Sequence, residues 1–125
     1  MSTARFNTLQ DVAGGNSMPV ADINQGRAKV WAWLNGTGVI ATLDSFGVSS
    51  FTDNGAGDYT CNFTTPFANA VYPGFVTGDT QASGFLGATR DGAALRTTAG
   101  CRTAVYNSAL AAADGYLQAM FLGDR

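Results

Sequence analysis

Two carboxylates, Asp53 and Asp58, flank a glycine-rich turn and are the side chains in this sequence that could carry out acid–base chemistry as a pair. Paired carboxyl groups can hydrolyse a glycosidic bond, one acting as the acid and the other as the base or nucleophile. The same run resembles the start of a Ca²⁺-binding loop, but it lacks the 12-residue spacing and the closing Glu of an EF-hand. Because Asp is also an ordinary turn residue, we expect both carboxylates to shape a turn, and the sequence predicts no catalytic residue.

The sequence lacks the residues needed for other common catalytic and metal-binding sites. The chain has no histidine, so neither a Ser-His-Asp nor a Cys-His arrangement can be built. Cys61 and Cys101 form no CxxC pair, which leaves too few soft ligands for a metal. Cys61 falls on the apolar side of an alternating segment, which favours a small buried side chain, and a disulfide with Cys101 is the alternative. We therefore expect no enzyme, no metal site and no cofactor.

The composition indicates a folded, strand-rich domain. The chain has 125 residues, of which 46% are hydrophobic and 13% are charged, and this excludes a disordered chain. Sixteen glycines and the absence of glutamate favour strands and turns over helices. The net charge is −2 and the seven basic residues are scattered, so we expect no nucleic-acid partner. No apolar run could cross a bilayer and the N-terminus lacks an apolar leader, so we expect no membrane insertion and synthesis in the cytoplasm.

Strand-like runs recur along the chain from Ala28 to Leu122. Turn signals such as Asn35-Gly36 and Asp114-Gly115 separate them. The runs are Ala28 to Leu34, Val39 to Leu43, Phe46 to Phe51, Tyr59 to Thr65, Val71 to Thr77, Gly84 to Thr89, Ala94 to Thr98, Cys101 to Tyr106 and Tyr116 to Leu122. A spacing of about eight to twelve residues with turns between the runs is typical of sandwiches and jelly rolls. The sequence predicts a small all-β fold over residues 28–125, an antiparallel β-sandwich of jelly-roll type.

The first 27 residues differ from the rest of the chain. They hold no helical or strand period for long and contain glycine and proline breakers. Phe6, Leu9 and Val12 are their early apolar anchors. Such a segment cannot bury enough apolar surface by itself to offset the entropy of ordering it. We therefore expect residues 1–27 to form an extended arm that docks onto a partner surface through these three side chains.

Two of the expected strands are apolar on both faces. The run from Tyr59 to Thr64 alternates cleanly, whereas Ala28 to Leu34 and Tyr116 to Leu122 carry apolar residues on both parities. Since an antiparallel sheet with one wet side needs one apolar face, something must cover the second face. We expect another copy of the chain to do so, and the alternative is that the arm folds back. The side chains expected at the subunit contact are Val30, Trp31, Trp33, Leu117, Ala119 and Phe121.

The stretch from Trp33 to Tyr72 resembles a family of phage virion proteins that are usually labelled tail-fibre or tail proteins. The shared motif is NGTG…DSFxVSSxTDNGxGDYTxNFTT, and the segments TLQD, NSMPVADINQGRAKVWA and YLQAMFLGD also resemble that family. The family pattern has Val where this chain has Cys61, which agrees with a small apolar core residue. Leu43 and Gly47 depart from the pattern, and residues 75–108 match nothing in it.

The resemblance implies a non-enzymatic structural protein on the exterior of a tailed phage particle, made in the bacterial cytoplasm. It implies a homotrimer, because phage fibres are typically trimeric. One expectation is a short tail fibre or fibre tip whose loops over residues 66–108 touch a glycan or protein on the host surface. Another is a capsid decoration protein that clamps coat subunits, and a capsule depolymerase is a third. The aromatic residues expected to contact a receptor are Phe67, Tyr72, Phe75 and Phe85.

Overall fold

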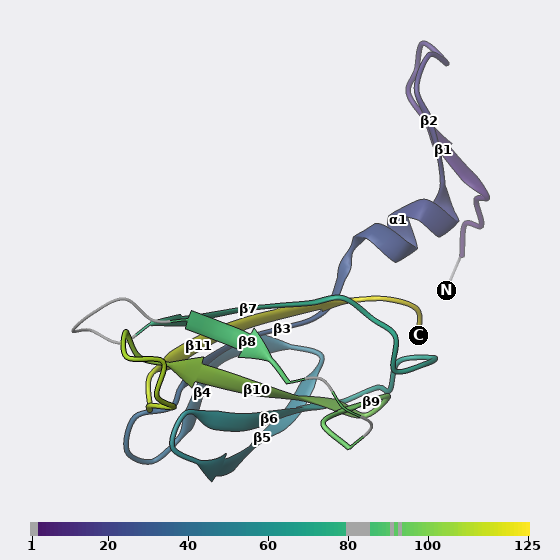
Figure 1. Cartoon of the computed structure of the whole chain (residues 1–125). Helices are drawn as coiled ribbons and strands as arrows, with labels where there is room; N and C mark the ends of the chain where they lie inside the picture. Colours follow the sequence, from purple (N-terminus) through teal and green to yellow (C-terminus); the bar gives the residue numbers. More distant parts are fainter. Residues whose placement is uncertain (1–2, 80–85, 91, 93) are drawn as a thin grey trace.

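The computed structural model describes residues 3–79, 86–90, 92 and 94–125 and shows an all-β, antiparallel protein with a short helix (Figure 1). This confirms the all-β, antiparallel part of the prediction. The helix α1 spans Val20–Gly26. The strands in this part of the chain are β1 (Thr8–Gln10), β2 (Ser17–Pro19), β3 (Ala28–Asn35), β4 (Ala41–Phe46), β5 (Val48–Gly55), β6 (Asp58–Phe63), β7 (Gly74–Asp79), β8 (Leu86–Thr89), β9 (Arg96–Thr97), β10 (Gly100–Tyr106) and β11 (Tyr116–Leu122).

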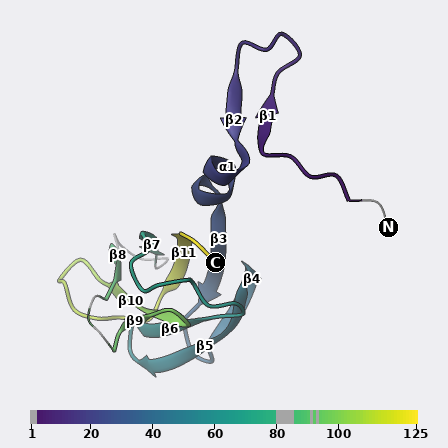
Figure 2. The same cartoon turned by 90° about the vertical axis from the view of Figure 1, so that its right-hand side faces the viewer.

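Two larger sheets make up the body of the protein. One has the strand order β4-β3-β11-β7, and the other has the order β5-β6-β10-β8, with β9 pairing with β10. The consecutive strands β3 and β4 form a hairpin in the first sheet, and β5 and β6 form one in the second. The last strand, β11, lies between β3 and β7. Figures 1 and 2 show the two sheets lying one over the other.

The hydrophobic core lies between the two sheets. Strands β3 and β11 supply one wall, and strands β6 and β10 supply the other. The buried cluster consists of Val30, Leu34, Tyr59, Cys61, Phe63, Phe67, Tyr72, Cys101, Val105, Leu117, Ala119 and Phe121. The ring of Phe63 lies edge-on to Phe67 at 5.2 Å between centroids and at the same separation from Phe121, which is a favourable aromatic spacing. Residues from both ends of the chain therefore share one core.

The alternation predicted for the run from Tyr59 to Thr64 is confirmed. Tyr59, Cys61 and Phe63 are buried, as the apolar parity of this strand requires. Cys61 faces Cys101 directly across the β6–β10 pairing, and both are free, buried thiols. The interpretation of Cys61 as a small apolar core residue is therefore confirmed.

The arm forms regular structure instead of one extended peptide. Strands β1 and β2 pair as a small hairpin, with Leu9 opposite Met18, and α1 follows directly. The hairpin and α1 project away from the two sheets (Figures 1 and 2). Lys29, the second residue of β3, is buried and its amino group donates hydrogen bonds to the carbonyl oxygen of Asn24 and, at 2.8 Å, to Oδ1 of the same residue. This contact fastens the end of α1 to the body.

Candidate functional site

Four of the six side chains predicted at the subunit contact lie in the core of the single chain. Val30, Leu117 and Phe121 have no exposed surface, and Ala119 is 5% exposed. The prediction is wrong for these four residues, because the face of β3 and β11 that carries them packs against β6 and β10. One of the two apolar faces of these strands is the core face.

The other face of the same strands is exposed and carries both tryptophans of the chain. Trp31 is 38% exposed and Trp33 is 46% exposed. We call this surface, on the far side of the β4-β3-β11-β7 sheet from the core, the outer face. The side chains on it are arranged in rows that cross the four strands, because antiparallel partners in register project from the same side.

Two adjacent rows of the outer face differ in chemistry. The apolar row consists of Phe46, Trp31, Met120 and Phe75, which are partners in the strand pairing and are all exposed. The polar row consists of Asp44, Trp33, Gln118 and Thr77, which are paired in the same way. The apolar row lies toward α1 and the polar row lies further from it, since β3 runs away from the helix (Figure 1).

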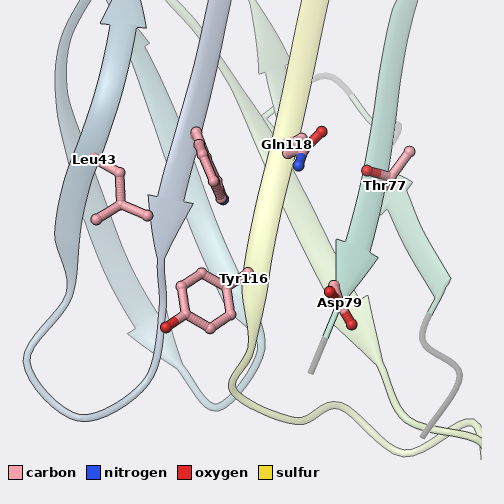
Figure 3. Close-up of a pocket in the computed structure, with 6 residues that line it drawn as sticks. Leu43, Thr77, Asp79, Tyr116 and Gln118 are labelled. Atoms are coloured by element: carbon pink, nitrogen blue, oxygen red, sulfur yellow. The ribbon is translucent and has the colours of Figure 1, made fainter. Parts of the chain in front are cut away.

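A shallow hollow of about 440 Å³ lies over the polar row and is lined by Trp33, Leu43, Thr77, Asp79, Tyr116 and Gln118. Its volume is within the roughly 300–1,000 Å³ of small-ligand sites. Figure 3 shows Leu43, Tyr116, Gln118, Thr77 and Asp79 on one side of the sheet, contributed by β4, β11 and β7. Leu43 joins this surface at a register shift, where β4 gains a residue relative to β3.

The polar side chains of the hollow have free hydrogen-bonding capacity. Within the described part of the chain, no hydrogen bond engages the side chains of Thr77, Asp79, Tyr116 or Gln118. The lining contains one carboxylate and no Lys or Arg. The hollow can therefore offer donors and acceptors beside the exposed ring of Trp33, but it offers no cation to an anionic ligand.

The aromatic residues predicted to contact a receptor are separated by the structure. Phe67 and Tyr72 are 3% exposed, and their rings stack at 4.4 Å in the core; the Tyr72 hydroxyl lies 2.8 Å from the carbonyl oxygen of Thr97, to which it donates. The prediction is wrong for Phe67 and Tyr72, because the segment that carries them covers the open end of the core. Phe75 is exposed, but it lies on β7 within the apolar row. Phe85 lies outside the described residues.

Asp58, one of the two turn carboxylates, is held in an ion-pair cluster. Arg102 donates to both of its carboxylate oxygens, at 2.7 and 2.8 Å, and Arg90 lies 2.9 Å from Oδ2. Burial alone would raise the pKa of Asp58, but the Arg102 hydrogen bonds and the charges of Arg90 and Arg102 outweigh it and lower the pKa. The carboxylate therefore ties β6 to β10 and to the segment after β8.

The other turn carboxylate shapes the turn, as the sequence predicts. The backbone N–H of Gly55 donates to Asp53 Oδ1 at 2.9 Å, which is the local bond expected of an Asp in a turn. Since Asp58 is bound by two arginines, the two carboxylates are not arranged as a free catalytic pair. Among the residues that the structure describes, no group of three Cys or Asp side chains could hold a metal ion.

The glycine-rich motif builds one corner of the body. The Tyr59 hydroxyl lies 3.0 Å from the carbonyl oxygen of Gly36 and 3.0 Å from Asp114 Oδ1. The same Asp114 oxygen accepts from the N–H of Gly57 at 2.8 Å. Gly57 has φ +61° and no room for a Cβ beside the Val105 carbonyl oxygen. The motif residues from two separate hairpins thus meet around Asp114, and their role here is structural.

The three predicted docking residues of the arm are exposed. Phe6, Leu9 and Val12 are at the surface, as are Met18 and Val20 on the same arm. An isolated two-stranded hairpin is marginally stable in water, so these apolar side chains agree with a segment that needs a partner. Docking through them stays a prediction.

Several of the residues that form the outer face were missed by the sequence analysis. Phe46, Met120, Thr77 and Leu43 gave no signal on their own, because their place on the outer face depends on which strands are neighbours in the sheet. Gln118 was the available clue: it shares the parity of Met120, and a polar residue on that parity marks it as the outward one.

Comparisons with known proteins complete the description. In the described part of the chain, no helix has both the length and the apolar character needed to span a bilayer. No protein-family model, no curated protein and no solved structure matches this chain.

Proposed function

We propose that this chain is a non-enzymatic structural protein on the exterior of a tailed phage particle, a short trimeric tail fibre or fibre tip that docks by its arm. The observation that carries the proposal is the arm itself. It projects from the body with Phe6, Leu9 and Met18 exposed, and such a segment gains stability when a partner covers it. The proposal is also supported by the motif from Asn35 to Thr65, which resembles that of phage virion proteins.

The body is proposed to be a β-sandwich. Its two antiparallel sheets share one core, as in sandwiches generally. A jelly-roll order would place most consecutive strands in opposite sheets, whereas β3–β4 and β5–β6 pair as hairpins. We therefore propose a sandwich linked by hairpins.

The homotrimer is proposed to form through the apolar row. Trp31, Phe46, Phe75 and Met120 are exposed and adjacent. Aromatic residues and Met are enriched in the cores of subunit interfaces, and charged residues are depleted there. The contact between copies thus keeps Trp31 from the predicted set, leaves out Trp33, which lies in the polar row, and replaces the four core residues with the neighbours of Trp31.

A second candidate function is a trimeric capsid decoration protein. The same exposed arm could clamp neighbouring coat subunits, with the body lying on the outside of the head. Three copies in one assembly would strengthen weak individual contacts in either case.

Copy number in purified particles tests the proposal and separates the two candidates. Quantitative mass spectrometry of intact particles would compare this chain with the major coat protein. We expect a copy number far below that of the coat protein, in tail-containing fractions. A copy number comparable with that of the coat protein would indicate the decoration protein, and absence from purified particles would overturn both.

An arm variant tests docking separately. Leu9→Asp places a charge on the exposed apolar side of the hairpin, and we expect it to fold but to be lost from particles. Ala13→Asp, at the tip of the same hairpin, is the matched control that should still be incorporated.

A further inference from the structure

We propose that the hollow over the polar row is a binding site for a neutral glycan, with Trp33 as the stacking platform. The hollow combines the exposed ring of Trp33 with four polar side chains, Thr77, Asp79, Tyr116 and Gln118. That the glycan belongs to a host surface rests on the proposed function; that the hollow binds a sugar does not.

The polar side chains of the hollow have unused hydrogen-bonding capacity. Among the described residues, none bonds to the side chains of these four residues, although they come from two adjacent strands and project into one hollow (Figure 3). Their hydroxyl and amide groups can donate and accept, and the Asp79 carboxylate accepts. A ligand that fills the hollow must therefore carry several donors and acceptors of its own.

The ring of Trp33 supplies an aromatic surface beside these polar groups. Trp33 is 46% exposed between Gln118 on one side and Asp44 on the other. An exposed aromatic face favours contact with apolar C–H groups, and the polar neighbours favour hydroxyl groups around the edge of the ligand. A pyranose ring has both: C–H bonds on its face and hydroxyls around its rim.

The charge of the hollow is negative. The hollow is lined by one carboxylate and by no basic residue, and Asp44 adds a second carboxylate beside Trp33 in the polar row. An acidic sugar, a sulfate or a phosphate would meet like charge without a compensating cation. The electrostatics therefore select a neutral sugar, and Asp79 can accept hydrogen bonds from its hydroxyls.

The site adjoins the proposed contact between copies but differs from it in chemistry, since a second hollow, lined in part by Trp31, Trp33, Phe75 and Thr77, spans the two rows. The apolar row lies about 7 Å from the polar row, since side chains two positions apart on a strand have that spacing. The apolar row lies nearer the arm and contains no charged residue. The polar row contains Asp44 and Gln118, which are unsuited to the core of an obligate interface. The hollow lies at the end of the outer face that is further from the arm.

Binding to the purified full-length chain tests the inference. The probes are neutral oligosaccharides of glucose, galactose, mannose and N-acetylglucosamine, with heparin as the anionic comparison. The emission of the two tryptophans gives one readout and isothermal titration calorimetry gives a second. We expect at least one neutral probe to bind and to shift the tryptophan emission, and heparin not to bind.

Variants locate the site. Trp33→Ala is expected to weaken the affinity at least about tenfold, as loss of a central aromatic contact does, while Trp33→Phe retains part of it. Gln118→Ala and Asp79→Asn should also weaken binding. Phe6→Ala removes an exposed aromatic ring on the arm and should leave binding unchanged. Circular dichroism confirms that each variant is folded.

The inference is overturned if no neutral probe binds, if heparin alone binds, or if a folded Trp33→Ala variant binds as tightly as the original chain. It is also overturned if Trp33→Ala dissociates the oligomer, because the polar row would then be a subunit contact. A chain that binds glycans but is absent from particles would leave this inference standing and overturn the proposed function. A chain that is present in particles but binds no glycan would do the reverse.

Discussion

The hydroxyl of Tyr59 lies 3.0 Å from a carboxylate oxygen of Asp114, although 55 positions separate the two residues in the chain. The contact joins the start of β6 to the turn before β11. The same hydroxyl also lies within hydrogen-bonding distance of the carbonyl oxygen of Gly36, in the glycine turn after β3. Burial, with the Asp114 carboxylate alongside, raises the pKa of Tyr59, so the phenol stays protonated and remains a hydrogen-bond donor.

Replacing Tyr59 with Phe is expected to destabilise the protein. The change removes the shared donor and leaves polar groups at this corner unpaired, which costs about 1–3 kcal/mol. Chemical denaturation gives the free energy of unfolding. Tyr106→Phe is the matched control, because no other described residue is hydrogen-bonded to the Tyr106 hydroxyl. Equal losses in the two variants would contradict a special role for the corner.

Gly57→Ala is expected to destabilise the protein strongly. The backbone has φ +61°, and an added Cβ would lie 2.6 Å from the Ala113 nitrogen and collide with the Val105 carbonyl oxygen. The left-handed conformation alone costs about 1–2 kcal/mol for a residue with a Cβ, and the collisions add to it. Thermal unfolding provides the measurement. Gly15→Ala, with open space around it, should change the melting temperature little; similar shifts for both would contradict the argument.

Acidification is expected to weaken the link between Asp58 and its two arginines. The pKa of Asp58 is lowered in the folded protein, so its contribution to stability is complete above the unfolded value of about 3.9 and is lost as the pH falls through the lower folded value. Asp58→Asn should cost about 2 kcal/mol at neutral pH and flatten the loss of stability below about pH 4. Denaturation across the pH series is the measurement. The exposed change Asp22→Asn is the control, and an unaltered pH profile in Asp58→Asn would refute the assignment.

The two thiols are expected to be unreactive in the folded protein. Burial, with Cys101 opposite, raises the pKa of Cys61 to about 12, so very little of the reactive thiolate exists at neutral pH. A thiol reagent such as DTNB should label Cys61 and Cys101 at a rate set by unfolding, and rapidly in denaturant. A cysteine introduced at the exposed Ser50 of β5 serves as the positive control. Fast labelling of both native thiols would contradict their burial.

The apolar row is expected to control assembly. Trp31→Ala and Phe75→Ala should each lower the oligomeric state measured by light scattering, because both remove exposed aromatic surface from the proposed contact. Val39→Ala removes an exposed apolar side chain from a loop and should have no such effect. A chain that is already monomeric at micromolar concentration before any substitution would remove the basis for the trimer.

The sequence predicted the strands better than it predicted their faces. Tyr59, Cys61 and Phe63 could be placed in the core because the residues between them are polar. Such an alternation shows which face of the strand is buried. In β3 both parities are apolar, and hydrophobicity alone does not distinguish the Val30 side from the Trp31 side. The pairing with β11 resolves it: Gln118 lies opposite Trp33, which marks that side as outward.

The hollow and the secondary structure of the arm were beyond sequence-based prediction for a different reason. The hollow requires β7 to lie beside β11 and an extra residue in β4, and these are long-range pairings that no local pattern encodes. In the arm, α1 is a helix of seven residues, too short to be stable by propensity alone. Its last turn is held by Lys29, which lies in β3 and outside the helix.

That buried lysine makes the junction between arm and body a stiff one. Its ammonium group is hydrogen-bonded to Asn24 near the end of α1, while its own backbone belongs to β3, an inner strand. The start of β3 and the last turn of the helix therefore move together. Whatever the hairpin holds, the tryptophans on β3 are then presented to the surroundings at a fixed angle. A rotation of the arm about the junction between α1 and β3 would therefore rotate the sheet as well.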